Sequence, residues 1–308
     1  MTILELLLGI LLSGLRSATP LLQVLLGETI TERAGVVNLG VEGQMLSGAC
    51  AGFAVAAVTG SPWAGLLAGI VAGMLLSSVH AFLVLVAGAN MFASGVAVWL
   101  LGGGLSAFFG IPFVGRRIDG FASPDFGGAA KLPLVGPILR VATPSVLIAL
   151  ATWVLCSLFL YRTRAGLRLR AVGESAESAS TLGISPPKVR WAAILAGGAL
   201  SGLGGASLSV DLVRNWVEWM TAGRGLVAVG LVIVARWNPW YALPAALLFG
   251  VVESLTLRLQ ALGVTISPYL LSTLPYLVCL GVLVWGSARA RSKGGMPRDL
   301  AQVFSKTE

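Results

Sequence analysis

The sequence predicts an all-α fold, a polytopic transmembrane helical bundle with about 8–10 spans. Of its 308 residues, 56% are hydrophobic and only 11% are charged, whereas a soluble domain carries about 25% charged residues. The apolar runs recur at lengths near the ~20 residues with which an α-helix crosses a bilayer. The alternating ten-residue pattern of an outer-membrane barrel is absent. We therefore treat residues 1–308 as a single transmembrane domain.

Turn and charge signals divide the apolar sequence into nine candidate spans. The first has no basic segment before it, because no Lys or Arg precedes Arg16, so we expect a retained helix and not a cleaved signal peptide. This span, which contains Pro20, and the short seventh span have the weakest signals. The nine ranges are 3–26, 40–59, 63–87, 91–110, 142–161, 189–210, 222–236, 240–258 and 267–286.

The longest polar interruption, residues 162–190, contains six basic side chains and is expected to be a cytoplasmic loop. Alternation of the spans then places the N-terminus outside and the C-terminus, with its basic tail 287–308, in the cytoplasm. With this orientation thirteen Lys and Arg residues lie inside and seven outside. The positive-inside bias accounts for the net charge of +8, so we predict no nucleic-acid partner.

A short Ala/Ser/Glu segment inside this loop, Glu174–Leu182, is expected to form two to three turns of helix. Gly183 suits the left-handed position after a helix end, and Pro186 with Pro187 prevents continuation. Two interpretations stay open: a solvated connector, or a helix on which another protein docks. Small side chains that allow close approach favour docking, and they are Ala176, Ala179 and Ser180.

A second polar stretch, residues 27–46, lies at the edge of the second span. Polar groups at membrane depth are costly and usually have a partner or a task. Glu28, Glu32 and Arg33 either have such a partner or are solvated in a cytoplasmic elbow. Asn38 and Glu42 are flanked by Val and Leu, so we expect them to be packed or to face a cavity.

Catalytic and metal-binding motifs are missing from the sequence. The single histidine, His80, excludes HExxH and any two-histidine metal site, and no Lys follows a Gly, which excludes a Walker A motif. Three cysteines lie in separate apolar runs without CxxC spacing, and we interpret them as core residues: Cys50, Cys156 and Cys279. We therefore expect no catalytic residue, metal or cofactor in this chain.

Small residues repeat at four-residue spacing in two of the spans, which favours close helix contact in lipid. Ordinary bundle packing is one interpretation, sliding of two Gly-rich helices during transport is another, and a degenerate internal repeat is a third. The two ridges are Gly65, Gly69 and Gly73, and Gly198, Gly202 and Ala206.

Four stretches carry a resemblance to a known family: ERAGVVNLGVEGQML, GLRLRAVGESAESASTLGISPPKVR, GANMFASGVAVWLLGGGL and GRGLVAVGLVIVARWNP. In this order they resemble ABC-transporter permeases of the branched-chain amino acid, ribose and nucleoside group, and more closely its nucleoside and simple-sugar branch. They cover most of residues 28–240. Ser175 and Ala176 depart from the family, which commonly has Asn and Pro there.

The resemblance implies the permease subunit of a bacterial ATP-driven importer in the plasma (inner) membrane. Its implied partners are two ATP-binding subunits that hold ATP and magnesium, a second permease subunit, paralogous or identical, and an extracytoplasmic substrate-binding protein. The loop would be the coupling helix that contacts the ATPase through Glu174, Ala176, Ala179, Gly183 and neighbours such as Arg170. Candidates for lining the substrate pathway are Asn38, Glu42, Asn90 and Ser94.

The alternative is an ion-coupled secondary transporter that works without an ATPase. Such a protein couples through ionisable groups inside the membrane. Glu42 and Glu253 are the two strong candidates in this sequence, with His80 a poor third. So few intramembrane acids weigh against this alternative, and an intramembrane enzyme lacks any nucleophile–base pair.

Overall fold

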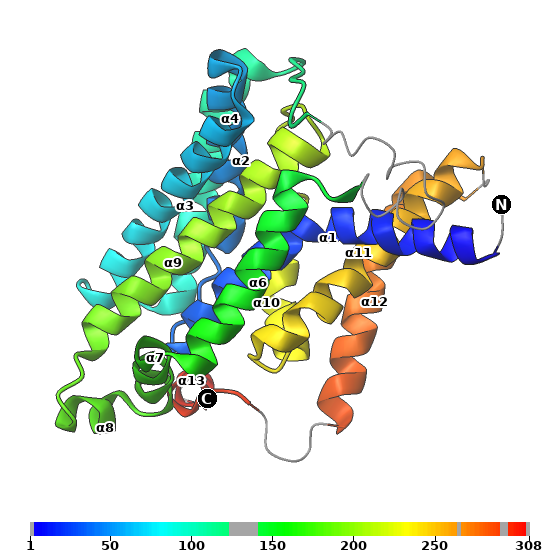
Figure 1. Cartoon of the computed structure of the whole chain (residues 1–308). Helices are drawn as coiled ribbons and strands as arrows, with labels where there is room; N and C mark the ends of the chain where they lie inside the picture. Colours follow the sequence, from blue (N-terminus) through cyan, green and yellow to red (C-terminus); the bar gives the residue numbers. More distant parts are fainter. Residues whose placement is uncertain (1–2, 123–140, 264–265, 290–294, 306–308) are drawn as a thin grey trace.

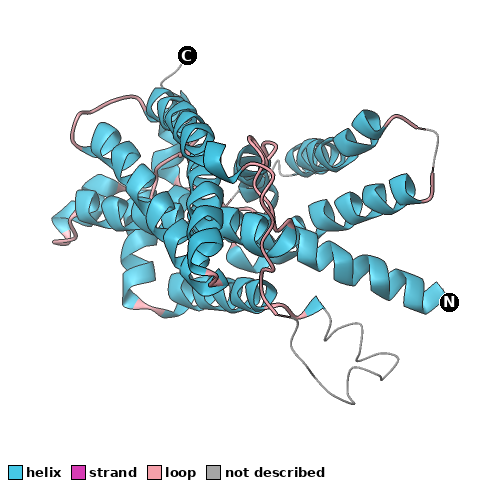
Figure 2. Ribbon diagram, turned by 90° about the horizontal axis from the view of Figure 1, so that it is seen from above, coloured by secondary structure: helices cyan, strands magenta, loops and turns pink. Residues whose placement is uncertain are grey.

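The computed structural model describes residues 3–122, 141–263, 266–289 and 295–305 (Figure 1). Within these ranges the regular structure is helical (Figure 2), and the only β-type pairing is an isolated bridge between Arg117 and Asn215. The all-α prediction is confirmed. Of the predicted C-terminal tail, residues 290–294 and 306–308 lie outside the described residues.

Among the described residues, seven helices are long and apolar enough to cross a membrane. The two other predicted spans correspond to α10 (Arg224–Val234) and α12 (Pro268–Arg289), whose apolar stretches are shorter. The seven are α1 (Ile3–Arg33), α2 (Val41–Thr59), α3 (Pro62–Leu85), α4 (Met91–Gly110), α6 (Pro144–Arg162), α9 (Pro186–Ala206) and α11 (Pro239–Ala261).

Local sequence explains where several spans begin. Side-chain oxygens of Ser61, Asn90 and Asn238 accept backbone N–H groups at the starts of α3, α4 and α11. A proline follows the capping residue in α3 and α11, where its missing N–H is not needed. At the end of α2, Gly60 adopts a φ of 68° and stops the helix.

The helix α1 continues to Arg33, although the sequence predicted its end at residue 26. Polar side chains are compatible with the last two turns of the helix because their hydroxyl groups donate hydrogen bonds to backbone carbonyls one turn earlier. The Thr29 hydroxyl donates to the Leu25 carbonyl at 2.7 Å, and that of Thr31 donates to the Gly27 carbonyl at 3.1 Å. The polar residues in this stretch therefore belong to the helix and do not mark its end.

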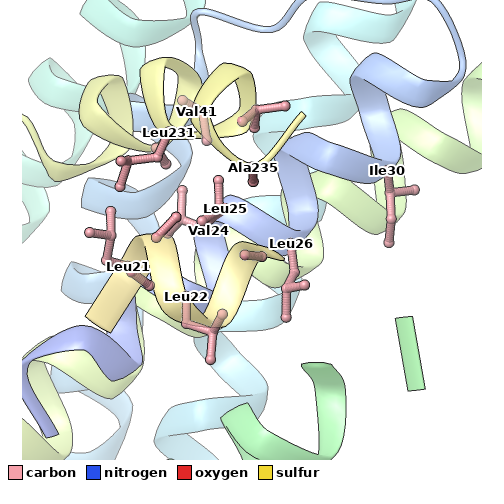
Figure 3. Close-up of a cluster of buried hydrophobic side chains, with 14 of the residues drawn as sticks. Leu21, Leu22, Val24, Leu25, Leu26, Ile30, Val41, Leu231 and Ala235 are labelled. Atoms are coloured by element: carbon pink, nitrogen blue, oxygen red, sulfur yellow. The ribbon is translucent and has the colours of Figure 1, made fainter. Parts of the chain in front are cut away.

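The core surrounds the middle of α1. Leu21, Leu22, Leu25 and Leu26 are buried there, in one cluster with residues of α2, α10 and α11 (Figure 3). Figure 1 shows α1 running through the molecule, from the N-terminus toward the ends of α6 and α9. The helix thus connects the α2–α3–α4–α9 group with α10, α11 and α12.

The two predicted glycine ridges lie against each other, because α3 packs on α9. A Cβ added at Gly73 would lie 2.1 Å from the Gly198 carbonyl oxygen, and one at Gly202 would lie 2.1 Å from that of Gly69. Gly65 is close to Gly52 of α2 in the same way. These backbones approach so closely that no side chain larger than hydrogen fits between them.

The polar loop forms two helices, α7 (Arg164–Glu174) and α8 (Ala176–Thr181), where the sequence predicted one helix over Glu174–Leu182. The break is at Ser175, whose extended backbone ends α7 and whose hydroxyl accepts the Ser178 N–H at 3.1 Å. A serine at this position favours a helix start over continuation. Three short helices complete the part of the chain that the structure describes: η1 (Ile111–Phe113), η3 (Ser207–Leu212) and α13 (Arg298–Ser305).

Candidate functional site

Glu42 connects α2 to the start of α10. Its buried carboxylate accepts hydrogen bonds from the Thr221 hydroxyl at 2.6 Å, the Gly223 N–H at 2.9 Å and the Gly225 N–H at 2.6 Å. The first backbone N–H groups of a helix have no partner inside it, and α10 receives no cap from its own N-cap residue. The acid therefore caps α10 from another helix, and the negative charge suits the helix dipole.

The segment before α10 is an irregular connection with an unusual backbone. Three of its non-glycine residues have positive φ values: Arg214 at 60°, Trp219 at 57° and Ala222 at 51°. Such conformations cost free energy and persist where the surroundings fix them. Here the Tyr276 hydroxyl donates to the Ala222 carbonyl, and Arg224 at the start of α10 forms an ion pair with Glu253 of α11.

Asn38 organises the turn between α1 and α2. Its N–H donates to Glu28 Oε1 at 3.1 Å, its Nδ2 donates to Gln44 Oε1 at 3.2 Å, and its Oδ1 accepts the Gly40 N–H at 3.0 Å. All three side chains are buried. The Gln44 Nε2 has no hydrogen-bond partner among the described residues, so this polar group keeps one free donor.

The other two pathway candidates occupy different places. Ser94 is buried and its hydroxyl lies 3.0 Å from His80 Nδ1, while His80 Nε2 lies 3.2 Å from the Val37 carbonyl oxygen. Ser94 is thereby connected to the turn that holds Asn38. Asn90 is exposed and caps α4 by accepting the N–H groups of Phe92 and Ala93, so its side chain is engaged in helix capping.

Glu32 and Arg33 hold the end of α1 against the start of α11. The Trp237 Nε1–H donates to the buried Glu32 carboxylate, and Arg33 Nε donates to the Trp237 carbonyl at 2.6 Å. Glu28 is buried as well. The interpretation of this stretch as a solvated elbow is therefore wrong for both acids, because each has a protein partner.

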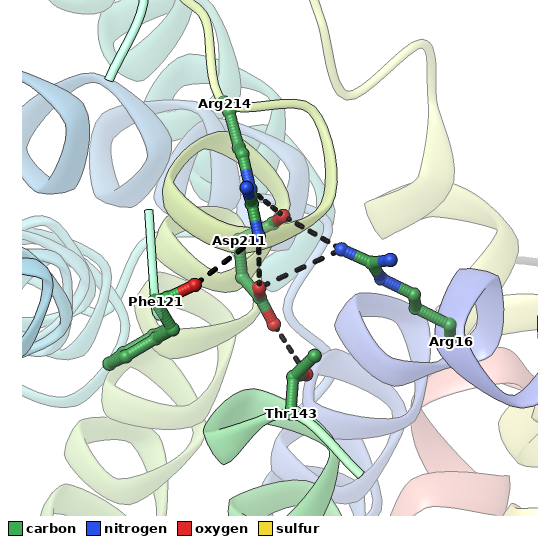
Figure 4. Close-up of polar contacts among 5 residues, drawn as sticks. All are labelled: Arg16, Phe121, Thr143, Asp211 and Arg214. Atoms are coloured by element: carbon green, nitrogen blue, oxygen red, sulfur yellow. Dashed lines mark hydrogen bonds and ion pairs between the residues drawn. The ribbon is translucent and has the colours of Figure 1, made fainter. Parts of the chain in front are cut away.

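Asp211 forms a second polar cluster, which the sequence analysis did not identify (Figure 4). It lies in the π-helical turn η3, where its carboxylate accepts the Thr143 hydroxyl at 2.6 Å. Arg16 of α1 and Arg214 lie 3.9 and 4.0 Å from the same carboxylate. Arg214 also donates to the Phe121 carbonyl at 3.4 Å. One acid thus connects α1, η3, α6 and the segment after α4.

The surface of the polar loop differs from the sequence prediction in one respect. Ala179 is buried inside the chain, so it is not presented to a partner as predicted. The exposed tip consists of Leu182, which is 78% exposed, and Gly183, which has a φ of 77° and open space around its Cα. Arg170 lies away from this tip, with its guanidinium 5.1 Å from the centre of the Tyr161 ring.

The C-terminal helix α13 lies beside this loop, next to α7 (Figure 1). Arg190, in the first turns of α9, donates to the Asp299 carboxylate at 2.5 Å and to the Ala34 carbonyl at 3.2 Å. The loop and the tail are therefore on the same side of the molecule. Glu174, Ala176 and Glu177 lie at the junction of α7 and α8, with both acids exposed.

Sequence reasoning missed the partners of these acids because they are far away along the chain. Thr221, Gly225 and Arg16 carry no motif of their own. The available signals were an Arg inside the apolar first span and an Asp directly after the sixth, since charges buried in a membrane are usually paired. Pairing these two would have identified the Asp211 cluster.

Comparison with known proteins gives a match to one protein family. Residues 10–283 match the model of the permease component of branched-chain amino acid transport systems. A putative glucose ABC transporter permease protein, TsgC13 of Haloferax volcanii, is 40% identical over 97% of this chain and 98% of the relative. No solved structure matches the chain.

Two further relatives are named for nucleosides. The guanosine ABC transporter permease protein NupQ of Bacillus subtilis is 31% identical over 91% of this chain and 93% of its own length. The nucleoside ABC transporter permease protein NupC of Lactococcus lactis is 33% identical over 77% of this chain and 78% of its own length. The residues matched by the family model, 10–283, include Glu42, Asp211 and the α7–α8 loop.

Proposed function

We propose that this chain, which belongs to the permease-component family of branched-chain amino acid transport systems, couples ATP hydrolysis by a partner subunit to the import of a solute. It is a multi-pass membrane protein and a permease subunit of an ABC transporter of the sugar and nucleoside type. It is a translocator. The family match over residues 10–283 carries the proposal.

The partner ATPase docks on the tip of the α7–α8 loop. In support, α8 projects beyond α6 and α9 (Figure 1), and its end exposes Leu182 beside the unhindered Gly183. Gly173 of α7 lies against the end of α1, since an added Cβ would be 2.1 Å from the Arg33 carbonyl oxygen. A push on the loop is thereby transmitted to α1.

The solute pathway runs beside the Glu42 and Asn38 groups. Both belong to irregular connections at helix ends, and non-helical backbone at membrane depth is tolerated where it is buried in protein or lines a cavity. Glu42 caps the start of α10, whereas the Gln44 Nε2 group has no hydrogen-bond partner in the described ranges of the chain and can donate to a solute. Movement of α1 against α2 and α10 would open or close this region by alternating access.

The solute is a sugar or a nucleoside, and the relatives named for glucose, guanosine and nucleosides support this choice. Both classes are rich in hydroxyl groups and neutral. Amide groups such as Gln44 suit them, because an amide both donates and accepts hydrogen bonds. ATP with magnesium is bound by the partner ATPase, and a separate extracytoplasmic binding protein delivers the solute.

The protein spans a bacterial plasma membrane with its C-terminus in the cytoplasm, together with a second permease subunit. The contact between Arg190 and Asp299 supports placing the loop and the tail on the same side. The basic residues of the loop favour the cytoplasmic side for both.

Reconstitution tests the coupling directly. The chain is placed in liposomes with its second permease, its binding protein and its ATPase, and uptake of radiolabelled glucose and guanosine is measured. We expect uptake to require ATP and to persist when ionophores remove all ion gradients. Uptake by the chain alone, driven by an ion gradient, would instead support the secondary transporter. Glu42 and Glu253 already have partners within the protein, which disfavours that outcome.

A further inference from the structure

A groove on the outside of the bundle shares no lining residue with the polar groups around Glu42, Asn38 and Asp211. Its lining residues come from α6, α7 and α9, and Figure 1 shows where these three helices lie. Ile30 of α1, which is buried, lies at its base. The cavity measures about 480 Å³, a volume within the range of about 300–1,000 Å³ that is typical of sites for small ligands.

The loop end of the groove carries two positive charges. Arg168 of α7 and Lys188 of α9 line it, both are exposed, and no Asp or Glu lines it with them. Within the described part of the chain, neither side chain forms an ion pair or a hydrogen bond. The nearby Arg190 differs, since it is paired with Asp299. The groove therefore has an uncompensated cationic end.

The rest of the groove is apolar, and its length is close to the thickness of one membrane leaflet. From Lys188 to Ala196 along α9, both of which line it, the axial rise is roughly 12 Å at about 1.5 Å per residue. One leaflet of the hydrocarbon core is about 15 Å thick, half of the whole core. Leu155 and Phe159 of α6 form the facing wall. The groove thus extends from the membrane surface well into one leaflet.

We propose that this groove binds one anionic phospholipid, with its phosphate between Arg168 and Lys188 and an acyl chain between α6 and α9. Charge complementarity selects the headgroup, because basic residues at the ends of membrane helices attract anionic lipids. Ala192 and Ala196 leave room for the chain, since their short side chains stand where α9 faces α6. The proposal requires only that the chain spans a membrane, so it stands independently of the proposed solute.

A second cavity in the molecule serves as an internal comparison. It measures about 510 Å³, lies between α2, α3 and α4, and is lined by apolar side chains and by Cys50, Ser47 and Ser106. It has no charged residue in its lining. A lipid bound in that cavity would meet no basic side chain, so an anionic headgroup would not strengthen its binding. Selective binding of an anionic lipid therefore indicates binding in the α6–α9 groove.

Native mass spectrometry of the purified full chain tests the proposal. The protein in mild detergent is titrated with phosphatidylglycerol, with phosphatidylcholine of the same acyl chains, and with inorganic phosphate. We expect phosphatidylglycerol to bind preferentially. The double variant Arg168→Gln/Lys188→Gln should weaken its binding by roughly 30-fold, from the contribution of each basic residue near a membrane surface, and should leave phosphatidylcholine unchanged.

The control pair Arg162→Gln/Arg164→Gln removes the same charge from the same loop, but neither residue lines the groove. It should leave the selectivity for phosphatidylglycerol in place. Filling the groove by Ala192→Trp should weaken the binding of both lipids, whereas Leu158→Trp, on α6 outside the groove, should not. Ala192 and Leu158 are both exposed, so the bundle tolerates either tryptophan.

Four results would overturn the proposal. These are equal binding of the two lipids, equal losses in the two charge pairs, displacement of the lipid by inorganic phosphate, and release of a co-purifying protein subunit instead of a lipid. The third result would identify a soluble anion as the occupant, and the fourth a protein partner.

Discussion

The carboxylate of Glu42 accepts a hydrogen bond of 2.6 Å from the N–H of Gly225, which lies 183 residues further along the chain. The contact is as close as the backbones allow, because a Cβ at Gly225 would be 2.7 Å from the Glu42 Cα. A helix start inside a bilayer has no water to satisfy it. The fold of α10 therefore depends on a side chain from α2.

Replacing this carboxylate should destabilise the protein. In Glu42→Gln one oxygen becomes an NH₂ group, which cannot accept a hydrogen bond and leaves at least one buried N–H or hydroxyl without a partner. We expect a loss of about 1–3 kcal/mol and a lower melting temperature in detergent, measured by thermal unfolding. Glu177→Gln, at an exposed position of α8, is the control and should not change stability. Equal stability of Glu42→Gln and the wild type would contradict the capping role.

The contact between α3 and α9 should not tolerate an added methyl group. Gly202→Ala would place its Cβ 2.1 Å from the Gly69 carbonyl oxygen, so the two helices must separate. Overpacking of this kind costs typically about 1–3 kcal/mol. The control is Gly104→Ala on α4, where no atom lies within 4 Å of the added carbon. Similar folded yields for both variants, measured by size-exclusion chromatography, would show that α3 and α9 adjust freely.

A bulky residue at the tip of the loop should block transport without removing the protein from the membrane. Gly183→Trp adds a large side chain at the proposed ATPase contact, and we expect uptake to be lost. Gly263 offers a matched control, because it also has a positive φ and open space around it, but it follows α11. Gly263→Trp should therefore retain uptake despite the same backbone strain. Normal uptake by Gly183→Trp would show that this loop does not couple the ATPase to transport.

The ion pair between Arg16 and Asp211 should appear as a coupling energy between two distant helices. The side chain of Asp211 is 3% exposed and that of Arg16 is 34% exposed, at a separation of 3.9 Å. For this partly solvated pair we expect a coupling of about 0.5–1 kcal/mol from a double-mutant cycle with Arg16→Gln and Asp211→Asn. Independent effects of the two substitutions on unfolding would show that the pair is not formed in the membrane.

Cysteine labelling tests the orientation. Ser178→Cys places an exposed thiol on α8, and a membrane-impermeant maleimide should reach it only from the cytoplasmic side. The native Cys50, Cys156 and Cys279 are buried, so their background labelling should be low. Labelling of intact cells from outside would invert the proposed topology.

The positions of most helices could be predicted from the sequence, because a bilayer-spanning helix needs about 20 apolar residues and little else. The two glycine ridges were also visible from their spacing, and the structure brings them together. The end of α1 could not be predicted, since Thr29 and Thr31 appear polar in the sequence yet bond to their own helix.

The polar clusters were harder to predict because they depend on which helices become neighbours. Glu42 was expected to be packed or to face a cavity, but Gly225, to which it bonds, is one of 40 glycines. Asp211 lies in a π-helical turn that shifts the register of the helix after residue 206, and no local signal indicates that turn. Ala179 suited an exposed docking face by its size, but the backbone turn at Ser175 directs it inward.

The contact between Arg190 and Asp299 has a consequence for biogenesis. Asp299, which neutralises Arg190, is synthesised 109 residues after it. Until translation reaches residue 299, the loop surface lacks its carboxylate partner. The surface around the start of α9 is therefore completed only after residue 299 has been synthesised, and a chain that stops before it would present Arg190 without its carboxylate partner.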